Sequence, residues 1–401
     1  MRLPRSMTPL LVLLALWIGC AGPATAQTFQ TAAPQAVLMD AETGAILLDV
    51  AGDRQVSPAS LVKLMTAEVI FREISAGRLK LEDEFVVSEH AWRRGGAPAG
   101  GSAMFLVPNA RVKIGDLLLG ILVVSGNDAA ITLAEGMSGS EAAFATLMNE
   151  RARELGLKNS TFRNANGWSD PEQRVTMRDM VRLADHIIRT YPDLYKLFGQ
   201  REMTWNKARR QNLNPLLTMD VGADGLKTGF LEESGYALVG SAVQNGQRLI
   251  LAMSGLKTAR DRQIEAKKLL DWGFRSFEVR TLLDAGTEVG EAAVFGGAKP
   301  SIKLKAKTAV RLPVPRGALD KVTARISYRG PVRAPVPAET ELGQLVILRN
   351  GVRALEVPVV TAEAVDSGTL SQRAWDSAYE LGRSVLRNGF RGTTGKGEPK
   401  P

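Results

Sequence analysis

Three short motifs occur in one order along this chain, and each lies in a different predicted element. Ser60-Leu-Val-Lys63 begins a predicted helix, Ser125-Gly-Asn127 lies at a turn after an apolar run, and Lys227-Thr-Gly229 lies on a predicted strand. A second copy of the first string, Ser254-Gly-Leu-Lys257, is predicted to be a strand end and the loop after it. As a set, the three motifs supply a nucleophile, a base and an anion-binding strand, the groups needed to attack an amide through a serine. The fold must therefore bring a helix, a turn and a strand together.

The first motif has the local context of an active-site helix. Pro58 precedes a mostly apolar segment, and because proline is favoured at a helix start, a buried helix is predicted from residue 58. Ser60 and Lys63 share a helix face, and the positive helix N-terminus favours an anion near Ser60. Lys63 can accept the proton of Ser60 only when neutral, and both burial and a second cation, Lys227, would lower its pKa. The alternative is an ordinary core helix with a solvated lysine.

The second and third motifs lie at a predicted turn and on a predicted strand. Ser125 and Asn127 end an apolar run, where they could also be simple helix-capping residues. Asn245-Gly246 separates two apolar runs after the third motif, which is a strong signal for a β-hairpin. The Lys-Thr-Gly strand is therefore predicted to lie beside an antiparallel pair. Gly229 would let another backbone come close, so an extended peptide could pair with this strand.

The three motifs and their flanks resemble the low-molecular-weight penicillin-binding proteins that are D-alanyl-D-alanine carboxypeptidases (peptidase family S11). The same ordered set also marks class A β-lactamases, and the resemblance covers roughly residues 27–390. It implies attack on the stem peptide of peptidoglycan, which ends in D-Ala-D-Ala, and acylation by β-lactam antibiotics. For catalysis, the resemblance implies that Ser60 is the acylated nucleophile, Lys63 its base and Ser125 a proton relay. The backbone amides of Ser60 and Phe230 would form the oxyanion hole. For substrate binding, it implies that Asn127 holds an amide of the substrate, that Lys227 and Thr228, beside Gly229, bind its carboxylate, and that Arg262 faces that carboxylate.

Some assignments stay open at this point. Arg262 could instead be a solvated charge on a helix, and the first proton could pass to Lys63 directly or through Ser125. The chain also departs from the family pattern at Val62, Phe230 and Leu213, where threonine, histidine and arginine occur in some or most members. These departures affect substrate preference and rate rather than the reaction class.

Three other functions compete with carboxypeptidase activity. A β-lactamase needs a deacylating base, typically a glutamate on a separate loop, and the expected Glu-x-x-x-Asn pattern is absent from residues 160–180 of the sequence. A DD-endopeptidase would use the same nucleophile. A non-catalytic wall-binding protein would not need Ser60, Lys63 and Lys227, all of which are present.

The motifs predict an α/β (α+β) catalytic domain of the DD-peptidase/β-lactamase-like fold over residues 27–277. A hairpin over 36–49, helices over 58–200, the hairpin after 227 and a closing helix over 264–274 suggest a mixed sheet covered by helices. Beyond about residue 277, short apolar runs alternate with proline-rich turns, which predicts a small all-β domain over 278–365. That domain carries no set of catalytic residue types and is interpreted as a spacer or a partner-binding module.

The two ends of the chain predict export and membrane association. Residues 1–26 read as a signal peptide with a small-residue cleavage site at Ala24-Thr25-Ala26, although Cys20, the only cysteine, could alternatively be a lipoprotein acylation site. Residues 366–391 form a basic amphipathic pattern typical of a helix lying on a bilayer surface, or of one packed on its own domain, and a flexible tail follows over 392–401. These features predict a periplasmic protein that is peripheral on the inner membrane.

Charge and histidine content exclude other classes of function. The net charge of +9 suits an anionic envelope of lipid headgroups or wall polymer, and no nucleic-acid-binding signature is present. His90 and His186 are isolated in the sequence, without metal-ligand spacing. Neither a metal nor another cofactor is predicted.

Overall fold

The structure is a computed structural model that describes residues 29–317 and 320–374. The predicted signal peptide over 1–26, the tail over 392–401 and all but the first residues of the helix predicted over 366–391 lie outside the described residues. In the part of the chain that is described, no helix is both long enough and apolar enough to cross a bilayer.

A five-stranded sheet forms the centre of the catalytic domain, with the strand order β2-β1-β9-β8-β7. Every pairing is antiparallel, so the expectation of a mixed sheet was wrong, whereas the hairpins predicted over 36–49 and around Asn245-Gly246 are confirmed. Strand β7, which carries the Lys-Thr-Gly motif, lies at one edge with β8 as its neighbour in the sheet. The strands are β1 (Gln35–Asp40), β2 (Ile46–Val50), β7 (Ala223–Leu231), β8 (Gly235–Gln244) and β9 (Gln247–Leu256).

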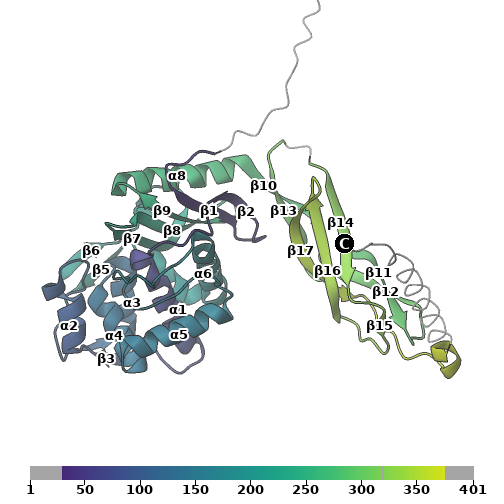
Figure 1. The fold of residues 1–401 in the computed structure, drawn as a ribbon, viewed down its shortest axis with the longest axis horizontal. Helices are drawn as coiled ribbons and strands as arrows, with labels where there is room; N and C mark the ends of the chain where they lie inside the picture. The colour runs from purple at the N-terminus through teal and green to yellow at the C-terminus, as the bar shows by residue number, and fades with distance from the viewer. Residues whose placement is uncertain (1–28, 318–319, 375–401) are drawn as a thin grey trace, which may run out of the picture. The chain divides into compact units, whose positions relative to one another are not determined.

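The two faces of this sheet are covered by different helices, as Figure 1 shows. Helix α8 (Ala259–Ser276) covers one face and confirms the predicted closing helix. It lies close to the sheet because Gly273 has no side chain: a Cβ there would lie 2.7 Å from Leu38 and 2.6 Å from Leu249. Since strand residues alternate between faces, Val37 points into the core of the helical cluster on the other side.

The helical cluster surrounds α1 (Lys63–Ser75), which is buried over most of its length. Two short antiparallel strand pairs accompany these helices. The first lies within residues 58–200, where the sequence predicted helices, and the second follows just after residue 200. They are β3 (Glu84–Val86) with β4 (Arg111–Lys113), and β5 (Glu202–Trp205) with β6 (Ala208–Gln211). The other helices are α2 (Glu89–Gly95), α3 (Ile114–Val123), α4 (Asn127–Ser138), α5 (Glu141–Glu154), α6 (Met177–Thr190) and α7 (Pro192–Tyr195).

The start of the active-site helix differs from the prediction. Residues Ala59–Val62 form a 3₁₀ turn, η1, and the α-helix begins only at Lys63. Ala59 has a left-handed backbone with φ 50°, a conformation that interrupts an α-helix and is unfavourable for a residue with a Cβ. Ser60 therefore lies in a tight turn at the N-terminal end of α1 rather than inside its first α-helical turn.

The C-terminal domain is all-β, as predicted. One sheet pairs β10 (Phe277–Leu283) with β13 (Val310–Pro315), and the other has the order β14-β16-β17-β12-β11-β15. Alternating apolar residues of these strands form a separate hydrophobic core. The larger sheet consists of β11 (Glu288–Phe295), β12 (Ser301–Ala306), β14 (Val322–Tyr328), β15 (Val332–Arg333), β16 (Glu341–Arg349) and β17 (Val352–Thr361).

Candidate active site

All three motifs meet at one cavity of about 400 Å³ beside the edge strand β7. The size is within the usual range for sites that bind small ligands. The cavity is lined by residues of the three motifs, of three loops, of the end of β7 and of helix α8: Ser60, Gly100, Gly101, Ser102, Ser125, Asn127, Asn166, Gly167, Trp168, Leu213, Thr228, Gly229, Phe230, Leu231 and Arg262.

Lys63 is fully buried and has three polar partners around its amino group. Its Nζ donates to Asn127 Oδ1 (2.8 Å) and to the backbone carbonyl of Asn166 (2.5 Å), and it lies 2.9 Å from Ser60 Oγ. The two carbonyl oxygens can only accept hydrogen bonds, whereas the hydroxyl of Ser60 can also donate one. A neutral amine would therefore use its two N–H groups on the carbonyls and direct its lone pair at Ser60, which is the arrangement a general base requires.

The surroundings of both motif lysines favour their neutral forms. Burial, and then the positive charge of Lys227, lower the pKa of Lys63 well below its usual range, and Asp128 opposes this shift. Burial, followed by the charge of Arg262, lowers the pKa of Lys227 to about 7. Both effects agree with the sequence argument, because desolvation and a like charge each disfavour a protonated amine.

Ser125 links the second motif to the third. It lies between α3 and α4 in a left-handed backbone conformation (φ 59°) and is almost fully buried. Lys227 Nζ donates to Ser125 Oγ at 3.0 Å and to the carbonyl oxygen of Thr228 at 2.9 Å. The hydroxyl of Ser125 therefore lies beside a buried amine, where it can pass a proton between groups of the site.

Asn127 and Asp128 position the loop that forms one wall of the cavity. The backbone amide of Asn127 donates to the carbonyl of Ser102 (2.9 Å). The carboxylate of Asp128 accepts from the backbone amides of Met104 (2.8 Å) and Leu106 (2.9 Å). The segment 88–103 was expected to be a loop near the site; its first part is helix α2, and residues 100–102 line the cavity.

The third motif presents strand β7 to the turn that holds Ser60. A Cβ on Gly229 would lie 3.2 Å from the carbonyl oxygen of Pro58 and 3.2 Å from Ala59, so glycine allows this close approach. Phe230 is half exposed, and its ring stacks on Tyr236 with centroids 4.2 Å apart. Ser60, Thr228 and Phe230 thus line the same side of the cavity.

The side chain of Arg262 belongs to the lining of this cavity. It lies in the first turn of α8, lines the cavity and is partly buried. Its guanidinium lies 5.5 Å from the Tyr236 ring, and its Nε has no hydrogen-bond partner among the described residues. Burial lowers its pKa from the usual value. A partly buried cation with an unsatisfied donor suits an anionic ligand.

Of the three residues that depart from the family pattern, two line the cavity and one lies in the hydrophobic core. Leu213 and Phe230 line the cavity and are half exposed, so they can affect substrate preference. Val62 is buried in the hydrophobic core behind the site. Ser254, in the repeated Ser-x-x-Lys string, is buried near the end of β9, and Lys257 follows after that strand, as predicted.

No sequence motif marks the segment Asn164–Trp168, yet its residues 166–168 form another wall of the site. Thr66 on α1 donates to the carbonyl of Ala165 (2.7 Å), and Trp168 N donates to Asn166 Oδ1 (2.9 Å). Gly167 has φ 92°, and a Cβ there would lie 2.1 Å from the carbonyl oxygen of Ala59. The Asn166-Gly167 pair signals a turn, but nothing in the sequence indicates that this turn contacts Lys63.

No acidic side chain lines the cavity in the part of the chain that the structure describes. Glu172, the nearest glutamate in sequence to the Asn164–Trp168 segment, is exposed and pairs with Arg163 at 3.3 Å. The described residues also contain no group of His, Cys, Asp and Glu side chains suited to a metal ion.

Comparison with known proteins agrees with this geometry. The sequence model of the peptidase S11 family, described as D-alanyl-D-alanine carboxypeptidase, matches residues 22–258, and that of the penicillin-binding protein 5 C-terminal domain matches 277–367. The chain is 37% identical to the D-alanyl-D-alanine carboxypeptidase DacA of Haemophilus influenzae over 355 residues, 88% of each chain. It is 38% identical to the D-alanyl-D-alanine carboxypeptidase DacC of Escherichia coli over 343 residues, 85% of this chain and 86% of the relative. The crystal structure of penicillin-binding protein 5 from Haemophilus influenzae superposes with a TM-score of 0.76 at 36% identity, covering 84% of this chain and 99% of the other.

Proposed function

Since the chain belongs to the peptidase S11 family of D-alanyl-D-alanine carboxypeptidases, we propose that it removes the terminal D-alanine from peptidoglycan pentapeptides through an acyl-Ser60 intermediate. We assign these roles mainly from the buried amine of Lys63, which lies 2.9 Å from Ser60 Oγ and donates hydrogen bonds to two carbonyl oxygens. That arrangement activates a serine without a histidine. It also makes Ser60 the residue that penicillin acylates.

In the acylation step, Ser60 Oγ attacks the carbonyl carbon of the penultimate D-alanine. The proton of the hydroxyl passes to Lys63, an ester bond forms, and the peptide C–N bond breaks. The proton held by Lys63 then passes through Ser125, which lies between Lys227 and the cavity, to the leaving amine, so that Lys63 is neutral again. Water then hydrolyses the ester with Lys63 again acting as base, so the cycle returns the enzyme to its starting state.

Two sets of groups hold the substrate for this reaction. Lys227, Thr228 and Arg262 bind the terminal carboxylate, which gives a role to the buried Lys227 and to the partly buried Arg262, neither of which pairs with a carboxylate of the described residues. The backbone amides of Ser60 and Phe230 stabilise the oxyanion, an effect typically worth on the order of 3 kcal/mol for each donor. Asn127 holds the amide of the acyl chain. The three carboxylate ligands would bind the free α-carboxylate that only the last residue of a peptide carries. The site therefore favours removal of a terminal residue over endopeptidase cleavage.

A β-lactamase would need a second base to release the acyl group quickly. The wall that would have to supply it consists of Asn166, Gly167 and Trp168, and no acid lines the cavity within the described part of the chain. Penicillin is therefore expected to form a long-lived ester with Ser60. A purely wall-binding protein would not need the buried lysine beside that serine.

One experiment tests the proposed chemistry. Purified protein is assayed for D-alanine release from a pentapeptide and for labelling by a fluorescent penicillin whose loss is followed over time. Ser60→Ala should abolish both signals, whereas Ser254→Ala, a matched change in the repeated Ser-x-x-Lys string, should keep both. Rapid loss of the label would indicate a β-lactamase, and labelling of Ser60→Ala would rule out Ser60 as the nucleophile.

The ends of the chain support a proposed location. Residues 1–26 would direct export to the periplasm, and the basic amphipathic helix predicted over 366–391 would hold the protein on the inner-membrane surface. The catalytic domain over 27–277 would then act on nearby wall peptides, with the β-domain over 278–365 as a spacer or a partner-binding module.

A further inference from the structure

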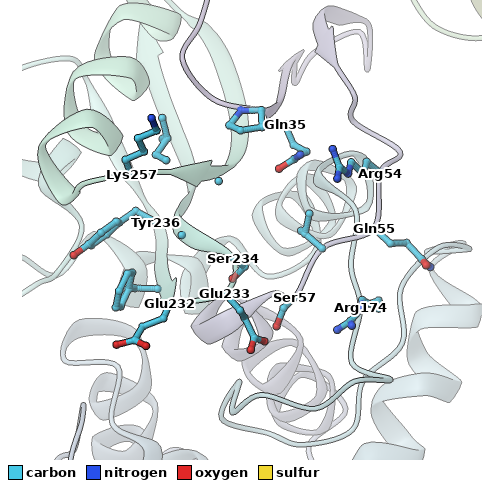
Figure 2. A pocket seen from close by; sticks show the side chains of 16 residues that line it. Gln35, Arg54, Gln55, Ser57, Arg174, Glu232, Glu233, Ser234, Tyr236 and Lys257 are labelled. Atoms are coloured by element: carbon cyan, nitrogen blue, oxygen red, sulfur yellow. The ribbon is translucent and has the colours of Figure 1, made fainter.

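The charged side chains around the active site differ in their exposure to solvent. A second cavity of about 960 Å³ shares Phe230 with the active site. Figure 2 shows its exposed charged side chains: Arg54, Glu232, Glu233 and Lys257. Water and salt screen charges at such positions. They therefore contribute little to the electrostatic balance at the buried amine of Lys63.

Asp128, by contrast, is a fully buried carboxylate in the first turn of helix α4. Its Oδ1 accepts from the backbone amides of Met104 (2.8 Å) and Ala129 (2.9 Å), and its Oδ2 accepts from that of Leu106 (2.9 Å). Amide N–H groups can only donate, and a helix N-terminus favours negative charge, so these surroundings suit an ionised carboxylate. Within the described chain, no cationic side chain pairs with it.

Two glycines allow close packing around this carboxylate. A Cβ on Gly126 would lie 3.0 Å from Asp128 Oδ1 and 3.0 Å from the Met104 nitrogen. A Cβ on Gly95, at the end of α2, would lie 2.5 Å from the backbone nitrogen of Asp128. Hydrogen bonds and packing thus fix the negative charge in place before any substrate binds.

The charge of Asp128 acts on Lys63. Asn127, the residue before Asp128, accepts a hydrogen bond from Lys63 Nζ at 2.8 Å. Burial lowers the pKa of Lys63 most, the charge of Lys227 on β7 lowers it further, and the charge of Asp128 raises it. Glu68, the buried carboxylate further along α1, is instead paired with Arg151 at 2.7 Å. Asp128 is therefore the carboxylate that can offset a positive charge at Lys63.

Such a charge forms during acylation, when the proton of Ser60 moves to Lys63 Nζ. Burial and the neighbouring Lys227 both disfavour an ammonium group at that position. A charge of opposite sign that is already fixed nearby stabilises the protonated amine without any rearrangement at the moment of reaction.

We propose that Asp128 is a positioning residue for acylation, whose buried and unpaired carboxylate provides the counter-charge for the proton that Ser60 transfers to Lys63. The inference rests on the proposed acyl-serine mechanism and adds a residue to it. Asp128 gains and loses no proton and does not touch the substrate. The same carboxylate holds Met104 and Leu106, so it links the adjoining wall of the cavity to the charge at Lys63.

The test follows the rate of Ser60 labelling by fluorescent penicillin as a function of pH. Asp128→Asn keeps the shape of the side chain and removes its charge, so the pKa of Lys63 should fall. The ascending limb of the profile should therefore move to lower pH. The rate at the optimum should fall about tenfold, because Lys63 becomes a weaker base but is not lost.

Two further variants separate charge from structure. Asp128→Glu keeps the charge but not the fit, so the labelling rate should fall while the ascending limb stays in place. Asp40→Asn is a matched control, because Asp40 is also fully buried, accepts hydrogen bonds only from Thr43 and Gln247, and does not line the cavity. It should leave both the rate and the limb unchanged.

Thermal unfolding reports whether each variant is folded, and Asp128→Ser provides a second uncharged variant if Asp128→Asn does not fold. An ascending limb at the wild-type pH in a folded, uncharged variant overturns the proposal, because a purely structural role would change the rate without moving the limb. Since the readout is acylation by penicillin, a wild-type protein that is labelled but releases no D-alanine overturns the carboxypeptidase function alone. A wild-type protein that is not labelled at Ser60 overturns both.

Discussion

The amino group of Lys63 donates a hydrogen bond to the backbone carbonyl of Asn166, at an Nζ–O distance of 2.5 Å. A backbone carbonyl cannot donate a proton, and it is fixed by the chain rather than by a rotatable side chain. The side chain of Asn127 is the second acceptor. With both acceptors in place, the remaining position around the Lys63 nitrogen is occupied by the hydroxyl of Ser60. The catalytic role proposed for Lys63 thus depends on a segment that carries none of the three motifs.

Replacing Lys63 by arginine should abolish acylation even though the positive charge and much of the length are kept. Arginine stays protonated in proteins and cannot accept the proton of Ser60. Penicillin labelling and D-alanine release should both fall at least about 100-fold, the typical contribution of a general base. Lys257→Arg, in the repeated string, should leave labelling unchanged. Labelling of Lys63→Arg at the wild-type rate would show that Lys63 is not the base.

The pH dependence of kcat/KM should be bell-shaped. Activity rises as Lys63 loses its proton and becomes a base, and it falls when Lys227 loses the charge that binds the substrate carboxylate, at a pH near its pKa of about 7. The positive charge of Arg262 lowers that pKa, so Arg262→Gln should move the descending limb to higher pH while raising KM. A pH–rate series on both proteins measures the shift. A descending limb that stays in place or moves to lower pH contradicts the proposed coupling.

Gly167→Ala should damage the site as well as the fold. The new Cβ would lie 2.1 Å from the Ala59 carbonyl oxygen and 2.8 Å from the Ser60 backbone nitrogen, so the Ser60 turn must shift. Gly139→Ala is a matched control, since Gly139 also has a left-handed backbone but no neighbour within 4 Å of its Cβ position. Both changes should destabilise the protein by at least about 1 kcal/mol in thermal or chemical unfolding. Only Gly167→Ala should also slow penicillin labelling of the folded protein, and equal labelling of the two variants would count against the close contact.

Removing residues 368–401 should release the protein from membranes without loss of D-alanine release. The basic amphipathic pattern of that segment suits a bilayer surface with anionic headgroups. Fractionation of cells that produce the full-length and shortened proteins measures the change. Equal recovery of both forms in the membrane fraction would contradict the proposed anchor.

Much of the fold and most of the site were predictable because the relevant signals are local. The Asn245-Gly246 turn determines the β8–β9 hairpin, and the spacing of Ser60 and Lys63 places both side chains on one side of a turn. Lys63 and Lys227 are both buried, which follows from their apolar flanks. The meeting of the three motifs at one site could be predicted because their side chains supply complementary parts of one reaction.

The remainder depends on contacts between distant segments. Lys63 meets Asn166 because Gly167 adopts a left-handed backbone against Ala59, and side-chain hydrogen bonds from Thr66 and within residues 164–173 hold that turn. The same contact accompanies the left-handed φ of Ala59, which replaces the predicted α-helical start with a 3₁₀ turn. No local pattern reports such packing. The antiparallel order of the sheet likewise follows from pairing across the whole domain.

Strand β7 lies at the edge of its sheet, and an unpaired edge is a general hazard, because any extended chain can add to it and lead to aggregation. Proteins commonly protect such edges with proline, charged side chains or bulges, but at the Lys-Thr-Gly motif these devices would also block the substrate. Here the loop at 100–102 and residues 166–168 also line the cavity beside the strand. We expect these walls to admit a single extended chain more readily than the edge of a second sheet. Walls that bind the proposed substrate would then also oppose polymerisation of the enzyme through its own active site.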